Sequence, residues 1–245
     1  MEKRGALLIA LIITLLVAGN YYVISGNVIK ENREKAIVSR IIDGDTVELE
    51  DGRIVRLLNI NTPEKNELGS NLAKEYMLDL QNKSVEIEIT GNDKYKRYLA
   101  RLFDERYINL ELVRLGFAKK FLVNDGELKD FDYAENMAVE KELGIWHKSP
   151  YRNCLVIEVD KKKELLEISN ACYFNLTGIV IEDESRKKYV FVSDFRKVVL
   201  HSGEGKNNST DVFWNMKTDI WNNDRDTIYA RDKNGGLIYH ESYGY

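Results

Sequence analysis

Short apolar segments bounded by turn residues recur between residues 36 and 103. Such segments are typical of strands, and residues 85–89 alternate apolar and polar positions with a period of two. Asp51-Gly52 predicts a tight hairpin turn between two of the segments. The pattern predicts five strands, at Ala36–Ile42, Thr46–Glu50, Arg53–Ile60, Val85–Ile89 and Tyr98–Phe103.

Apolar residues at helical spacing predict a helix over Asn71–Gln81, after the third strand. Two further helices are predicted at Asn109–Leu115 and about Leu128–Leu143, and a glycine ends each of them. Five strands with helices after the third and the fifth are typical of a small Greek-key barrel. We therefore predict an α+β domain at residues 36–150, an OB-fold five-stranded barrel with helices packed on it.

The helical period disappears beyond Pro150, and this change of pattern marks a domain boundary. Seven short strands in about 90 residues follow, which is typical of a β-sandwich. They are predicted at Cys154–Val159, Leu165–Ser169, Thr177–Ile181, Lys188–Ser193, Lys197–His201, Thr227–Arg231 and Leu237–Glu241. We therefore predict a second, all-β domain at residues 151–245.

The N-terminus has the pattern of an export signal. Lys3 and Arg4 precede an apolar run, so residues 1–25 are predicted to be a signal peptide or a membrane anchor. As a helix, Ala6–Ile24 would span roughly 28 Å, which barely meets the hydrocarbon thickness, so cleavage and anchoring both stay open. A buried core helix is the less favoured alternative. Residues 26–35 are polar and predict a tether, and the rest of the chain is predicted to be extracytoplasmic, membrane-anchored or secreted.

Composition narrows the class of protein. The 245 residues are 44% hydrophobic and 31% charged, which argues against disorder and allows one or two ordinary cores. The formal net charge of −4 gives no overall attraction to nucleic acid. Any phosphate binding must therefore come from a local arrangement of arginine and lysine.

Cys154 and Cys172 are the two cysteines of the chain. An oxidising exterior would let them form a disulfide, whereas two buried free thiols are the alternative, and the sequence does not decide between them. Neither cysteine has a histidine or a second cysteine at metal-ligand spacing, which argues against a zinc site.

Charged residues of the first domain suggest chemistry on a phosphodiester. Such hydrolysis needs a cation, donors that hold the developing negative charge, and a group that orients or deprotonates water. Asp43 and Asp45 offer hard oxygen ligands at the first turn, Arg56 and Arg97 offer guanidinium groups for phosphate, and Glu64 follows a proline-stiffened turn. Each residue alone has an ordinary structural explanation, so their combination and order carry the prediction.

IDGDTV, VRLLNINTPE, DKYKR and GIW occur in that order between Ala36 and His147. Over these residues the chain resembles the staphylococcal nuclease (thermonuclease) family. The resemblance implies an OB-fold, Ca²⁺-dependent endonuclease that cleaves DNA and RNA with little sequence preference and leaves 3′-phosphates.

The resemblance also implies roles for individual residues. Arg56, Glu64 and Arg97 match the family's catalytic residues, with the arginines on phosphate and the glutamate on water. Asp45, Asn61 and the Thr62 carbonyl match its calcium ligands. Lys94 and Tyr95, within DKYKR, are expected to contact the substrate.

This chain departs from the family pattern in two places. Asn61 stands where the family has a second aspartate, which predicts weaker metal binding. Leu122 and Asn124 stand in the stretch where the family carries two tyrosines that pack on the nucleotide, so base stacking is in question.

The second domain resembles the lamin tail domain, an immunoglobulin-like sandwich. The resemblance rests on LLEISNACYFNLTGIVIED, KKYVFVSDF and the closing run, in which HSGEG, VFW and WNN fall in the family's order. It implies attachment to a surface or a protein partner. Trp214 and Trp221 could stack on a ligand, but core filling is the favoured interpretation. The rival to an exported nuclease is a nucleic-acid or protein binding module that has kept the fold and lost catalysis.

Overall fold

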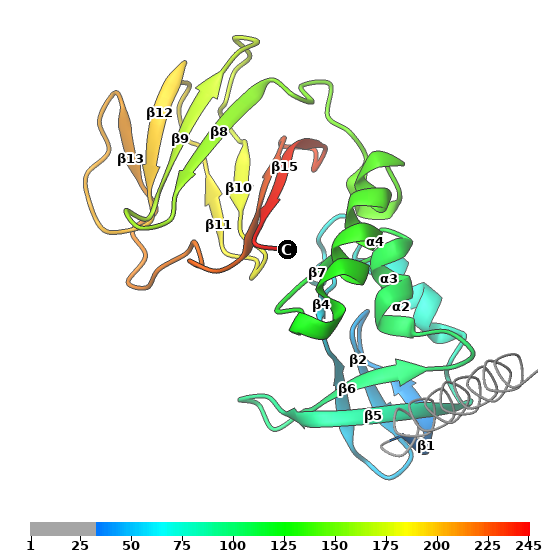
Figure 1. The fold of residues 1–245 in the computed structure, drawn as a ribbon. Coiled ribbons are helices and arrows are strands. Elements are labelled where there is room, and N and C mark those ends of the chain that lie inside the picture. The colour runs from blue at the N-terminus through cyan, green and yellow to red at the C-terminus, as the bar shows by residue number, and fades with distance from the viewer. Residues whose placement is uncertain (1–32) are drawn as a thin grey trace, which may run out of the picture.

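The computed structural model describes residues 33–245 (Figure 1). The predicted signal peptide or anchor at residues 1–25 and most of the predicted tether lie outside the described residues. Within residues 33–245, no helix is both long enough and apolar enough to cross a membrane.

A closed five-stranded barrel forms the first half of the described chain, as predicted. Neighbouring strands follow the order β1-β2-β3-β6-β5, and all pairs are antiparallel except β3 with β6. Its strands are β1 (Glu34–Ile41), β2 (Thr46–Leu49), β3 (Ile54–Leu57), β5 (Ser84–Asn92) and β6 (Tyr98–Phe103). Strand β1 begins two residues before the expected Ala36, because Glu34 and Lys35 already pair with β5.

The predicted third strand, Arg53–Ile60, is divided in the structure. It ends at Leu57, and Ile60–Asn61 forms a separate short strand, β4, that pairs with β7 (Lys119–Lys120). Asn59 between them has a left-handed backbone with φ of 66°, which a continuous strand cannot contain. The break turns the chain out of the barrel and toward the second domain.

Within residues 33–245, three α-helices and two short 3₁₀ helices accompany the barrel: α2 (Ser70–Leu78), α3 (Ile108–Arg114), η1 (Asp125–Glu127), α4 (Leu128–Glu140) and η2 (Gly144–Trp146). Helix α4 is three residues shorter than predicted. The chain behind it turns back at Gly144, whose φ is +53°, and approaches Gly116 so closely that a Cβ on Gly116 would lie 2.3 Å from the Leu143 carbonyl oxygen. Both helix-ending glycines therefore serve this close approach.

The C-terminal half contains two four-stranded antiparallel or mixed sheets, in the orders β11-β10-β14-β15 and β13-β12-β9-β8. Residues of both sheets, among them Ile181 and Leu200, belong to one hydrophobic core. Trp221 is buried in this core, and the partly buried Trp214 packs against the core. The strands are β8 (Leu155–Asp160), β9 (Leu165–Asn170), β10 (Val180–Glu182), β11 (Lys188–Val190), β12 (Lys197–His201), β13 (Asp211–Phe213), β14 (Asp226–Arg231) and β15 (Leu237–Tyr243).

All seven strands expected in this domain have a counterpart, and β13 is an addition that pairs in parallel with β12. The positions of both tryptophans favour the core-filling interpretation. The relation to immunoglobulin-like sandwiches and lamin tails stays a prediction.

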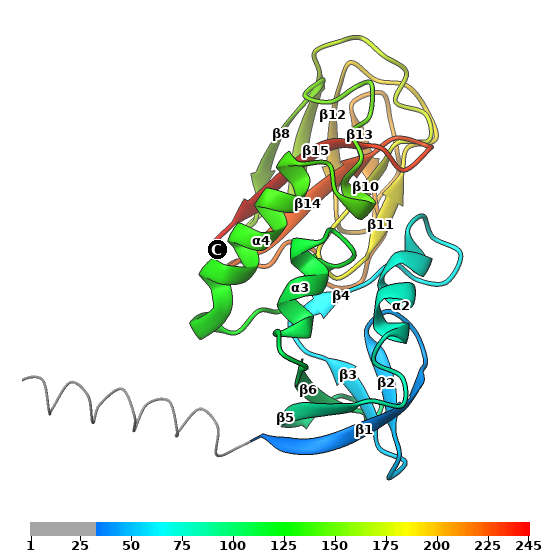
Figure 2. The same ribbon diagram turned by 90° about the vertical axis from the view of Figure 1, so that its right-hand side faces the viewer.

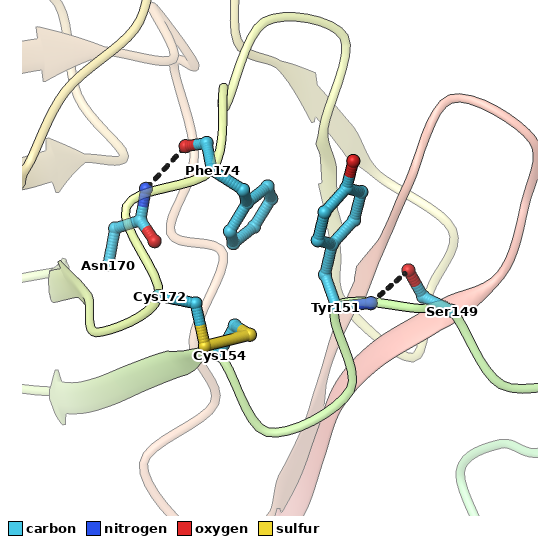
Figure 3. The surroundings of a disulfide bond; sticks show 6 residues. All are labelled: Ser149, Tyr151, Cys154, Asn170, Cys172 and Phe174. Atoms are coloured by element: carbon cyan, nitrogen blue, oxygen red, sulfur yellow. Dashed lines mark hydrogen bonds between the residues drawn. A yellow bond between two sulfur atoms is a disulfide. The ribbon is translucent and has the colours of Figure 1, made fainter.

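Cys154 and Cys172 form a disulfide in the structure (Figure 3). It joins the residue before β8 to the turn after β9, and Tyr151 stacks on Phe174 beside it, with ring centroids 4.3 Å apart. Of the two alternatives that the sequence left open, the structure contains the disulfide.

The two domains share a small core of their own. Ile145 and Trp146 of the first domain pack with Tyr229 and Leu237 of the second. Trp146 and Tyr229 stack with centroids 5.6 Å apart, and Figure 2 shows α4 beside β14 and β15. This contact sets the second domain against the end of the barrel from which β4 emerges.

Candidate active site

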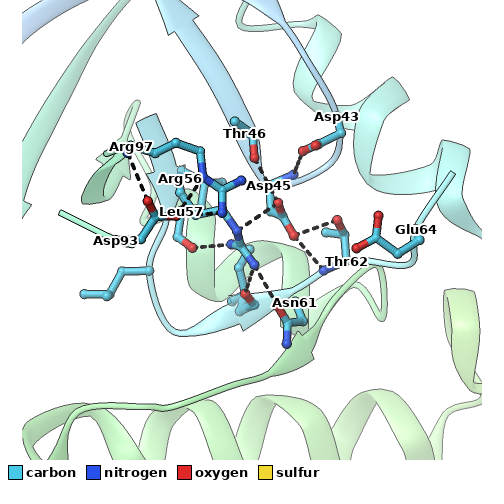
Figure 4. A network of polar contacts seen from close by, with 12 residues as sticks. Asp43, Asp45, Thr46, Arg56, Leu57, Asn61, Thr62, Glu64, Asp93 and Arg97 are labelled. Atoms are coloured by element: carbon cyan, nitrogen blue, oxygen red, sulfur yellow. Dashed lines mark hydrogen bonds and ion pairs between the residues drawn. The ribbon is translucent and has the colours of Figure 1, made fainter. Parts of the chain in front are cut away.

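The charged residues singled out in the sequence gather at one end of the barrel (Figure 4). Asp43 and Asp45 lie in the turn between β1 and β2, Arg56 on β3, and Arg97 just before β6. A cavity of about 550 Å³ brings them together with Thr62, Pro63 and Glu64, which follow β4. The barrel thus collects residues that lie far apart in the sequence around a single hollow.

Arg56 is buried and its guanidinium is bonded on every side. Its Nε lies 3.2 Å from Asp45 Oδ1, and Nη1 donates to the Leu57 carbonyl at 2.6 Å. Its Nη2 donates to the Ile60 carbonyl at 2.8 Å and to Asn61 Oδ1 at 2.7 Å. Burial lowers the pKa of Arg56, and the nearby Asp45 opposes that effect. Because its bonds reach β3, β4 and the first turn, Arg56 fixes the shape of the site.

Asp45 ties the first turn to the loop after β4. Its Oδ2 accepts hydrogen bonds from the Thr62 backbone N–H and from Thr62 Oγ1, both at 2.9 Å. The neighbouring Asp43 accepts from the Asp45 backbone N–H at 3.0 Å. Burial and the negative charge of Asp45 raise the pKa of Asp43. Two carboxylates thus stand close together at the cavity, where a cation would relieve their repulsion.

Asn61 lies apart from this group. It does not line the cavity of Asp43 and Arg56, but a second hollow of about 340 Å³ between the domains. Its amide oxygen accepts from Arg56, and its Nδ2 donates to the Glu184 carbonyl at 3.1 Å. The Asn61 oxygen already accepts from the cationic Arg56 and does not face the cavity of Asp43 and Asp45, so its role as a ligand stays a prediction.

Arg97 lines the cavity and is held by Asp93, with Nε and Nη2 each 2.7 Å from Asp93 Oδ2. Tyr95 is exposed, and the Arg97 guanidinium carbon lies 5.5 Å from its ring centroid. Lys94 is exposed as well and does not line the cavity. Lys94 and Tyr95 could therefore meet a substrate only beside the cavity.

The oxygen atoms around the cavity have the chemistry of a hard cation site. The carboxylates of Asp43, Asp45 and Glu64 and the Thr62 carbonyl are ligands that calcium prefers. Within residues 33–245, no group of three or more His, Cys, Asp or Glu side chains has the geometry of a metal centre. The residues thus fit an oxygen-ligated cation by their chemistry, through two carboxylates and a carbonyl rather than a preformed cage.

One residue of this site was missed by sequence reasoning. Arg186, in the turn between β10 and β11 of the second domain, lines the same cavity. Its Nη1 lies 2.7 Å from Glu64 Oε1 and donates to the Thr62 carbonyl at 3.1 Å. No motif or spacing pointed to it, because the contact joins residues 124 apart through the packing of two domains.

Comparison with known proteins bears on the barrel directly. Residues 54–148 match the family described as Staphylococcal nuclease homologue. Uncharacterized protein MJ1439 of Methanocaldococcus jannaschii is 33% identical over 149 residues, which cover 46% of this chain and 71% of that protein. The chain belongs to the staphylococcal nuclease homologue family. The matched residues include Arg56, Asn61, Glu64 and Arg97, whereas Asp43 and Asp45 precede them.

Two further relatives carry endonuclease in their names. An uncharacterized endonuclease of Escherichia coli O157:H7 is 30% identical over 115 residues, which cover 44% of this chain and 74% of that protein. Endonuclease YhcR of Bacillus subtilis (strain 168) is 23% identical over 197 residues, which cover 70% of this chain. This chain spans 15% of the length of YhcR, so the activity of that whole protein is not carried over to it.

Proposed function

We propose that this protein is an endonuclease that hydrolyses phosphodiester bonds of DNA and RNA with little sequence preference and with the help of calcium. The observation that carries the proposal is the cavity in which Arg56, Arg97 and Glu64 meet Asp43 and Asp45. It supplies anion-binding groups, an exposed carboxylate and hard oxygen ligands within one space. Membership of the nuclease family and two relatives named as endonucleases support the same activity.

The residues of the cavity have separate roles in the proposed reaction. Glu64 is the group able to accept a proton from the attacking water, whose oxygen then bonds to phosphorus as the ester oxygen leaves. Arg97 presents a planar fork to the phosphate oxygens, and Arg56 adds positive charge behind it. A calcium ion held by Asp43, Asp45 and the Thr62 carbonyl would neutralise part of the phosphate charge.

Export and attachment are part of the proposal. The apolar N-terminal run supports an extracytoplasmic enzyme that is anchored or released, and a disulfide is expected in an oxidising compartment. The resemblance of the second domain to lamin tails supports a role in binding a surface or a protein partner.

A binding module without catalysis is the second candidate. The observation that favours it is the ion pair of Glu64 with Arg186, which engages the carboxylate that should act on water. A hydrolysis assay separates the two candidates, since a binding module would retain nucleic acid and leave it intact.

The test uses the full-length protein in mild detergent, with single-stranded and duplex DNA and RNA, in calcium, in magnesium and in chelator. We expect cleavage in calcium. In Arg97→Lys it should fall by about 100-fold or more, because lysine keeps the charge but loses the fork. Arg114→Lys is the matched control, since Arg114 also binds a carboxylate, that of Glu111, through two nitrogens but lies on α3 outside the cavity.

Two results would reject the proposal. One is that the parent cleaves nucleic acid with neither calcium nor magnesium. The other is that the parent and Arg97→Lys cleave equally well.

A further inference from the structure

The turn between β10 and β11 places one side chain of the second domain inside the nuclease cavity. Arg186 lines that cavity together with Arg56 and Arg97, so three guanidinium groups surround one space. Each guanidinium has a carboxylate partner, in Asp45, Asp93 or Glu64. The cavity is nevertheless lined by five basic side chains and only three acidic ones, and the charges of Arg186 and Arg97 contribute, after burial, to the lowered pKa of Arg56. This is the electrostatic arrangement of an anion site.

In the described part of the chain, the Arg186 guanidinium contacts the protein through only one of its nitrogen atoms. Both of its contacts with the first domain, to Glu64 and to the Thr62 carbonyl, are made by Nη1. Among residues 33–245, its Nε and Nη2 have no hydrogen-bond partner, and 29% of its side chain is exposed. A guanidinium bonded through Nη1 alone keeps two further nitrogens, with three N–H donors, for a ligand.

The backbone at Arg186 is also unusual. Its φ is 73°, in the left-handed region, and its N–H donates to the Asp183 carbonyl at 3.2 Å within the turn. Glycine or asparagine adopts this conformation at lower cost than arginine does, and such strain is concentrated at functional positions. Ten other non-glycine residues of the described chain also have a positive φ, so the case for Arg186 rests on its contacts and not on its backbone.

The turn is anchored to the first domain on both sides of Arg186. The Glu184 carbonyl accepts from Asn61 Nδ2, Lys188 forms an ion pair with Glu67, and Glu182 lies 2.6 Å from Lys119 Nζ. The position of the Arg186 backbone is therefore set before any ligand arrives, and only the side chain has to change partners.

We propose that Arg186 is a third phosphate-binding arginine of this active site, supplied by the second domain. Without substrate it pairs with Glu64 and the Thr62 carbonyl. When a nucleic-acid phosphate enters the cavity, its oxygens replace both partners on the guanidinium, which leaves Glu64 free to accept a proton from water. The active site is then a composite of both domains, and this inference rests on the nuclease activity proposed above.

The experiment replaces Arg186 with methionine in the full-length protein in mild detergent. Arg225→Met is the matched control, because Arg225 also makes a one-nitrogen contact between the domains, to Asp125 at 2.8 Å, outside both cavities. One measurement is the anisotropy of a labelled single-stranded oligodeoxynucleotide in chelator at several salt concentrations. The other is steady-state cleavage with calcium, from which kcat and KM are obtained separately.

We expect Arg186→Met to weaken oligonucleotide binding about tenfold or more at low salt. The slope of log K against log salt should fall by about 0.7, the value for one lost phosphate contact on a single strand. KM should rise and kcat should fall, while Arg225→Met stays like the parent. Arg186→Lys should recover the slope, because its charge still neutralises one phosphate, but not kcat.

Unchanged binding and slope in Arg186→Met would overturn the inference. Faster cleavage by that variant would also overturn it, since Arg186 would then only obstruct Glu64. If the parent binds the oligonucleotide without cleaving it, the proposed activity fails while the binding measurement still decides on Arg186. If the parent neither binds nor cleaves, both proposals are rejected.

Discussion

The two domains of this protein meet in two regions of opposite character. One surrounds Lys120 and Glu135 and excludes water, whereas the other joins Arg186 to Glu64 at the edge of an open cavity. Both contain an ion pair with a short contact, at 2.6 Å in the first and 2.7 Å in the second. The comparison shows that the distance between two charges does not reveal what their contact does.

In the buried region, the charged groups of Lys120 and Glu135 are paired with other groups of the protein. The side chains of Lys120 and Glu135 are fully buried, and Glu135 Oε1 also accepts from the Lys120 backbone N–H at 2.9 Å. Tyr229 and Ser242 of the second domain complete the cluster through hydrogen bonds to Glu135 and Lys120, respectively. Burial alone would raise the pKa of Glu135, but Lys120 and His240 lower it to about 2. Lys120 and Glu135 both belong to the first domain, so the hydrogen bonds of Tyr229 to Glu135 and of Lys120 to Ser242 are the contacts that fasten the second domain here.

The region at the cavity is exposed and exchangeable. The side chain of Glu64 is 65% exposed, and a solvent-exposed ion pair contributes little to stability. A substrate phosphate can therefore compete for Arg186 at small cost. The contacts of Glu182, Glu184 and Lys188 with the first domain hold the β10–β11 turn in reach of the barrel.

The largest effect is expected from breaking the buried pair. Lys120→Met leaves Glu135 buried without its cation, which should lower the free energy of unfolding by about 3 to 5 kcal/mol in urea denaturation. The double variant Lys120→Met/Glu135→Leu should recover much of the loss, because it removes the unpaired charge. A loss below about 1 kcal/mol in the single variant would contradict the dependence of the buried Glu135 on Lys120.

A smaller, pH-dependent effect is expected from Glu184, whose carboxylate accepts from Tyr245 OH between the two regions. Burial raises the pKa of Glu184 to about 7. The folded protein thus retains this proton at pH values where the unfolded chain has lost it. Stability should fall as the pH rises from 4.5 through 7, by on the order of 3 kcal/mol at most for this group.

Glu184→Gln isolates that contribution. Glutamine does not ionise, so the difference in unfolding free energy between variant and parent should grow in favour of the variant across this range. Asp226, whose pKa burial raises to about 6, adds the same trend to both proteins, but its charge also raises the pKa of Glu184, so the two contributions cancel only in part. A difference that stays constant with pH would show that Glu184 is already ionised in the folded protein.

The smallest effect is expected from the exposed pair. Arg186→Met should change the free energy of unfolding by about 1 kcal/mol or less, similar to Arg225→Met, because both remove partly exposed ion pairs. Urea denaturation of the two variants in parallel measures this. A loss above about 2 kcal/mol for Arg186→Met alone would remove the distinction between the two regions.

Much of the barrel could be predicted from local patterns. The five barrel strands were expected with small errors at their ends, since strand alternation and turn residues act over a few positions. The errors occur where a single residue overrides the pattern. Asn59 ends β3 earlier than predicted. Strand β13 was not predicted, because its three residues pair with β12 and have no alternating pattern of their own.

In the candidate site, too, some residues lie where the sequence predicted them and others do not. Arg56, Glu64 and Arg97 were identified from their order along the chain, and they do meet at one cavity. Asn61 contacts Arg56 and the Glu184 carbonyl and does not line that cavity, so its predicted role as a ligand stays a prediction. An amide forms whichever hydrogen bonds its surroundings offer, and here a partner 123 residues away takes part.

The sequence by itself determined the strands of the barrel and its charged turn, because each depends on neighbours a few residues apart. Only the tertiary structure decided that Cys154 faces Cys172 and that Arg186 enters the cavity of the other domain. These contacts join residues through the packing of whole sheets. Their geometry depends on the sum of many weak interactions, and no short stretch of the chain contains that sum.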